Sequence, residues 1–130
     1  METKAVILLI AVSALLLFVP LTVAQDEGVY IPDSGLEEAI RTAIRRPQDE
    51  IYLGDLLRLT RLDAYGRAIA DLTGLEYCVN LVSLTLDHNA ISDLAPLSGL
   101  VCLRQLDLSY NLIEDLAPLA ELVNLNVLWI

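Results

Sequence analysis

Apolar residues recur through the second half of the chain with a fixed period of 22 residues. Residues 81–102 and 103–124 are identical at 12 of 22 aligned positions. Within each copy the apolar positions first alternate with polar ones and then fall three residues apart. The alternation predicts a short strand, and the longer spacing predicts a 3₁₀ or short helical return. Because the period is fixed, strand and return form one coil, and successive coils stack into a solenoid.

Aligning the repeats separates positions that face the core from positions that face solvent. In the strand Leu84-Thr85-Leu86 both leucines point inward and the threonine points outward. Successive strands are expected to pair in parallel. The outward positions expected to contact a partner are Asp63, Tyr65, Thr85, Asp87, His88, Asp107, Ser109, Tyr110 and Trp129. Tyrosine, tryptophan and histidine supply contact area and polar tips at interfaces, although an ordinary solvated sheet also carries polar residues here.

Two sets of polar residues repeat with the same period after the strand. Asn89 and Asn111 fall at the corner, where an inward amide can bond backbone groups that would otherwise be buried unpaired. They predict a structural asparagine ladder. Asp71, Asp93 and Asp115 also stack at this period. We interpret them as caps that accept backbone N–H bonds from the return, and the alternative is a cation site.

The segment before the repeats is amphipathic but lacks their period. Leu36, Ile40 and Ile44 lie four residues apart and predict one apolar stripe on a helix, with Asp33 or Ser34 as its N-cap. A short strand at residues 51–53 and a helical turn at residues 56–59, capped by Asp55, are expected to follow. Because the first coil of a solenoid has an exposed apolar end, we expect this segment to cover it.

The N-terminus has the pattern of an export signal. Lys4 is followed by an apolar run at residues 5–19, and small residues end at Ala24. This pattern predicts a signal peptide at residues 1–24, cleaved after Ala24, and a protein that is secreted or exposed on the cell envelope. The alternative is an uncleaved anchor, because residues 5–24 are long enough to span a bilayer.

The chain then divides into a cap region, residues 25–58, and repeats, residues 59–130. The repeats comprise three units and the first strand of a fourth. Since the last coil has no covering neighbour, two expectations follow. Either the repeats are the truncated first part of a longer protein, or the bare end self-associates with another chain.

Composition and charge argue against several classes of function. Acidic residues outnumber basic ones 18 to 8, and a net charge of −10 argues against nucleic acid and against electrostatic docking on anionic lipid. We expect no membrane contact after signal cleavage, no metal and no cofactor. His88 is the only histidine, and neighbouring strand residues such as Asp87 are expected on the opposite face. The two cysteines, Cys78 in a leucine slot and Cys102 in an asparagine slot, lack zinc spacing. We therefore expect that the protein is not an enzyme.

The repeat residues resemble a known family. The motif LxxLxLxxNxIxDLxPLxxLxx runs from Leu81 to Leu100 and again from Leu103 to Leu122. It is similar to the 22-residue repeats of bacterial, internalin-like leucine-rich repeat proteins, and IPDSGLEEAIR resembles the helical cap that precedes such repeats.

The resemblance implies a curved α/β solenoid with the parallel sheet on its concave face and the short returns on its convex face. Such proteins mostly bind proteins through the concave face. We therefore expect an extracellular module that binds a protein ligand. The alternative is a structural spacer, or part of a larger exported protein whose activity lies beyond Ile130.

Overall fold

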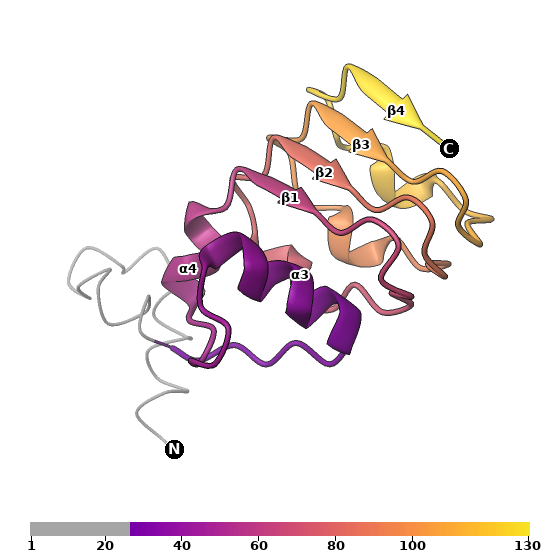
Figure 1. Cartoon of the computed structure of the whole chain (residues 1–130). Helices are drawn as coiled ribbons and strands as arrows, with labels where there is room; N and C mark the ends of the chain where they lie inside the picture. Colours follow the sequence, from indigo (N-terminus) through magenta and orange to yellow (C-terminus); the bar gives the residue numbers. More distant parts are fainter. Residues whose placement is uncertain (1–26) are drawn as a thin grey trace, which may run out of the picture.

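The structure, a computed structural model, describes residues 27–130, which form a stack of coils with a helix against the first one (Figure 1). The elements are α3 (Ser34–Ile44), α4 (Leu53–Arg58), β1 (Arg61–Asp63), η2 (Leu75–Tyr77), β2 (Ser83–Thr85), η3 (Ala95–Leu97), β3 (Gln105–Asp107), η4 (Ala117–Leu119) and β4 (Val127–Trp129). The predicted signal peptide, residues 1–24, lies outside the described residues.

Each coil contributes one strand to a parallel sheet. The strands follow one another in the order β1-β2-β3-β4. Leu62 is in register with Leu84, Leu84 with Leu106, and Leu106 with Leu128. The first three of these leucines are buried. The predicted register and the inward direction of the leucines are therefore confirmed.

The returns lie on the side of the coils away from the strands (Figure 1). The returns contain one 3₁₀ turn each, and in η3 and η4 a proline stands in its first turn. Proline suits this position because its φ is already helical and the missing N–H has no partner there. The backbone N–H of Ala95 donates to Asp93 at 2.8 Å, and that of Ala117 donates to Asp115 at 2.8 Å. The periodic aspartates therefore hold the entry to each return.

Helix α3 covers the open end of the first coil. Its N-cap is Asp33, which accepts the N–H of Leu36 at 3.0 Å. Leu36, Ala39 and Ile40 are buried, while Ile44 is only partly buried against the core. The apolar stripe is therefore directed at the solenoid, and the helix lies beside β1.

The link from α3 to β1 differs from the prediction. Residues 51–53 form no regular strand, because only Tyr52 pairs, in an antiparallel bridge with Gly28, and Leu53 already begins α4. Asp55 does not precede this helix as its cap. It lies in the first turn and accepts the N–H of the N-cap residue Tyr52 at 3.1 Å. The helix therefore starts earlier than the apolar pattern indicated.

The core is a single column of leucine and isoleucine that runs through the coils. Cys78, in a leucine slot, is fully buried among them. In the last coil Leu116 and Leu128 are 41% and 37% exposed, because no further coil of the described chain lies over them. None of the helices within residues 27–130 is long and apolar enough to cross a bilayer.

Candidate functional site

The exposed side of the sheet carries the outward residues predicted from the repeat. Asp63, Thr85, Asp107 and Trp129 lie in one register row across the four strands. Asp63 is exposed and Trp129 is 49% exposed, whereas Thr85 and Asp107 are half-buried. The two ends of this row are therefore more accessible than its middle.

Three aromatic rings lie next to one another just beyond the strand ends. The ring centroids of Tyr65 and His88 are 5.2 Å apart, and those of His88 and Tyr110 are 4.2 Å apart. We call these three residues the aromatic row. Tyr65 and Tyr110 are 57% and 75% exposed. Repeat alignment pairs Tyr65 with Asp87 rather than with His88, so the sequence did not indicate that the row is continuous.

The backbone explains how the row forms. His88 and Tyr110 have φ values of 58° and 54°, and Gly66, at the same repeat position, has 60°. This left-handed conformation suits glycine and costs an ordinary residue about 1–2 kcal/mol. It turns the side chain away from strand geometry. The second and third coils therefore place aromatic rings where the first coil has no side chain.

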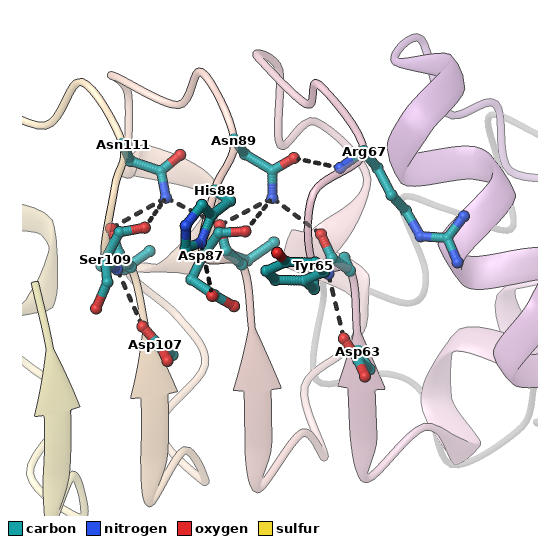
Figure 2. Close-up of polar contacts among 12 residues, drawn as sticks. Asp63, Tyr65, Arg67, Asp87, His88, Asn89, Asp107, Ser109 and Asn111 are labelled. Carbon is teal, nitrogen blue, oxygen red and sulfur yellow. Dashed lines mark hydrogen bonds and ion pairs between the residues drawn. The ribbon is translucent and has the colours of Figure 1, made fainter.

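Carboxylates border the aromatic row. Asp63 accepts the N–H of Tyr65 at 3.2 Å, and Asp107 accepts that of Ser109 at 3.0 Å, each through one oxygen atom (Figure 2). Asp87 Oδ2 lies 3.0 Å from His88 Nδ1. The expectation that these two neighbours point to opposite faces was therefore wrong. Strand alternation does not apply, because His88 is left-handed and lies outside β2.

The asparagines lie behind the aromatic row and hold the coils together. The Asn89 amide nitrogen donates to Ala64 O at 2.9 Å and Leu86 O at 2.8 Å, and its oxygen accepts the N–H groups of Arg67 and Ile69, both at 3.0 Å. Asn89 thus bonds its own coil and the preceding one, and Asn111 one coil further makes a similar set of bonds (Figure 2). These bonds fix the corner from which the aromatic row projects.

A second asparagine ladder precedes the strands and was not recognised from the sequence. Asn80 donates to Leu57 O at 2.7 Å, and Asn124 donates to Val101 O at 2.8 Å, in each case 23 residues earlier. Cys102 occupies the equivalent slot in the coil between them and is exposed. The shared slot was visible in the alignment, but the bond that it supports was not.

The two cysteines are free and lie in different environments. Burial, with a smaller contribution from the charge of Glu76, raises the pKa of the Cys78 thiol to about 12. This thiol is therefore protonated and behaves as a small apolar side chain. Within residues 27–130, His, Cys, Asp and Glu side chains form no group of three or more suited to a metal ion.

Comparison with known proteins relates this geometry to a family. A family model described as leucine-rich repeats in two copies matches residues 79–121. No curated protein matches the chain closely. An internalin, InlF, from Listeria monocytogenes is 37% identical, with a TM-score of 0.73 over 75% of this chain and 29% of its own.

Two further Listeria monocytogenes structures are similar. Internalin C2 is 31% identical, with a TM-score of 0.58 over 75% of this chain and 54% of its own. The functional domain of InlJ, described as including a cysteine ladder, is 29% identical, with a TM-score of 0.69 over 74% of this chain and 21% of its own. The chain spans about half of internalin C2 and less than a third of the others. In repeat sequence and in fold, it is an internalin-like leucine-rich repeat protein.

Proposed function

We propose that the chain is an extracellular protein-binding module that captures its partner on the exposed, concave face of the sheet. The observation that carries this proposal is the aromatic row. Three rings from three successive coils are exposed together, and two of them stand on left-handed backbone. Exposed aromatic groups of this kind are the usual anchors of protein interfaces.

The surroundings of the row favour a partner with cationic groups. Asp63, Asp87 and Asp107 lie at or just beyond the strand ends beside the rings. Aromatic faces attract arginine and lysine side chains, and nearby carboxylates pair with them. The net charge of −10 would also accelerate the approach of a basic partner. The predicted export signal is consistent with a partner met outside the cell.

The proposal can be tested by selecting a random phage-displayed peptide library against the immobilised full chain. We expect enrichment of peptides that carry arginine or lysine beside aromatic residues. Replacing Tyr65 with Ser and Tyr110 with Gly should abolish the enrichment. Glycine is chosen for the second site because the first coil has Gly66 in the same conformation, so folding should be little affected.

A matched control removes an aromatic ring elsewhere. Tyr30 is 82% exposed and lies in the cap region, so Tyr30→Ser should enrich the same peptides as the natural chain. If the chain is only a structural spacer, neither the natural chain nor any variant should enrich peptides. Equal enrichment by the Tyr65→Ser, Tyr110→Gly variant would also contradict binding at the aromatic row.

A further inference from the structure

Basic residues are unevenly distributed over the solenoid. Residues 27–130 contain seven arginines and no lysine. Three of the arginines form salt bridges with carboxylates of the cap region. Arg61 and Arg104 are exposed and form no salt bridge with any described residue. Their positive charge is therefore directed at solvent.

These two arginines line the same open groove, which runs across the starts of the four strands and has a volume of about 560 Å³. Between them lie Val82, which is 38% exposed, and the half-buried Ser83. The volume is in the range of ligand-binding clefts, about 300–1,000 Å³. We call this feature the arginine groove.

The backbone under the arginine groove is already hydrogen-bonded. Thr60 O accepts the N–H groups of Val82 and Ser83 at 2.8 and 3.2 Å. Val82 O accepts those of Arg104 and Gln105 at 2.9 and 3.1 Å. An added β-strand would therefore find no free backbone partners at these positions. A ligand in the groove must be recognised by side chains, chiefly by the guanidinium groups.

The sheet face is therefore polarised. The arginine groove lies at the strand starts, whereas Asp63, Asp87 and Asp107 lie at or beyond the strand ends. Arg61 and Asp63, the first and last residues of β1, are two steps apart, which is about 7 Å along the strand. The strand starts therefore present positive charge and the strand ends negative charge to a ligand that crosses the sheet.

We propose that the arginine groove holds an acidic, extended segment of the partner protein, with one carboxylate on Arg61 and another on Arg104. This inference rests on the proposed function, because the same partner would place its cationic side chains on the aromatic row. The two charged edges together would fix the direction in which the partner crosses the sheet.

The spacing favours a peptide over a single anionic group. Arg61 belongs to the first coil and Arg104 to the third, so their backbones are about 10 Å apart at about 4.8 Å per strand. A single phosphate or sulfate would have to draw both guanidinium groups together, whereas two carboxylates give each arginine its own bidentate partner. In an extended chain two glutamates four residues apart lie on the same face, about 13 Å apart, within reach of the two flexible arginine side chains. The exposed Val82 between the arginines suits an aliphatic side chain on that face, midway between the glutamates.

The test uses the full chain and a blocked peptide that contains Glu-Ser-Val-Ser-Glu in a glycine and serine background, in which both glutamates and the valine lie on one face of the extended chain. Binding is measured by isothermal titration calorimetry at low ionic strength. The double variant Arg61→Gln, Arg104→Gln should weaken the binding at least about tenfold. Arg45→Gln removes an exposed arginine outside the groove and should leave the affinity unchanged.

Each other result overturns the inference. Equal binding of a peptide with both glutamates changed to glutamine would show that the carboxylates are not recognised. Binding of a sulfated disaccharide instead of the acidic peptide would assign the groove to glycans. If the acidic peptide does not bind, it is excluded as an occupant of the arginine groove. Because this peptide lacks cationic and aromatic groups, these failures are distinct from loss of library enrichment at Tyr65 and Tyr110.

Discussion

Asp33 joins the cap helix to the first coil by accepting the N–H of Ala70 at 2.9 Å, 37 residues further along the chain. The same oxygen accepts the N–H of Asp71 at 3.1 Å, and the other oxygen caps α3 through Leu36. A single carboxylate therefore satisfies backbone donors in two elements that the repeat period does not connect. The cap is held by this polar clamp as well as by its apolar stripe.

The clamp predicts a pH dependence of stability. Partial burial raises the pKa of Asp33, but hydrogen bonds from the N–H groups of Ala70, Leu36, Asp71 and Gly35 outweigh it, so the pKa lies below its ordinary value of 3.8. A lowered folded-state pKa gives stability that is complete above the unfolded value and is lost as pH falls through the folded value. Urea unfolding should show the natural chain to be more stable than Asp33→Asn near neutral pH.

This difference should shrink as the pH falls below 3.8, the ordinary value for the group. Comparison with the variant isolates Asp33 from the other carboxyl groups that titrate in the same range. A stability difference that does not change with pH would contradict the assignment of the clamp to the ionised carboxylate.

Because the cap lies in close contact with the first coil, we predict that Gly35 cannot be replaced by a larger residue without loss of stability. A Cβ atom at Gly35 would lie 2.3 Å from the backbone oxygen of Arg67. Gly35→Ala should therefore lower the free energy of unfolding by about 1–3 kcal/mol, measured by urea denaturation. Gly99 is the matched control, because a Cβ there meets nothing within 4 Å. Equal effects of the two substitutions would contradict tight packing of the cap.

The first asparagine ladder predicts a large loss of stability at Asn89. Replacement by Ala removes donors and acceptors from backbone groups of two coils at once. Since unsatisfied buried groups cost about 1–3 kcal/mol each, Asn89→Ala should lower the free energy of unfolding by roughly 2–4 kcal/mol. Asn80→Ala, which removes one exposed bond, should cost about 1 kcal/mol. Similar losses at both sites would contradict a special role for the inner ladder.

The interrupted second ladder predicts a stabilising substitution. In Cys102→Asn the new amide should reach Val79 O, the carbonyl 23 residues earlier, as the amide of Asn124 reaches Val101 O. We expect the free energy of unfolding to rise by about 0.5–1.5 kcal/mol. Cys102→Ser is the control, because its hydroxyl is one atom shorter than the amide. If thermal or urea unfolding shows that the serine and asparagine variants are equally stable, the proposed bond to Val79 O is contradicted.

Sequence periodicity was sufficient for the coils because each coil contacts mainly its neighbours. Leu62, Leu84 and Leu106 had to point inward, since a slip by one residue would expose every one of them. The corner position of Asn89 and the return caps follow from the same alignment. The cap region was less predictable, as the start of α4 shows, because a segment without a period has no second copy to correct its boundaries.

The amino-acid sequence by itself therefore determined the repeat, its register and the division between core and surface. Only the tertiary structure decided which surface residues meet. Left-handed backbone at His88 brings its ring beside Tyr65 of another register row, and stacking of coils places Arg61 and Arg104 in one groove. Burial of apolar side chains leaves a period in the sequence, whereas contacts between exposed side chains depend on local φ angles and lateral stacking, which leave none.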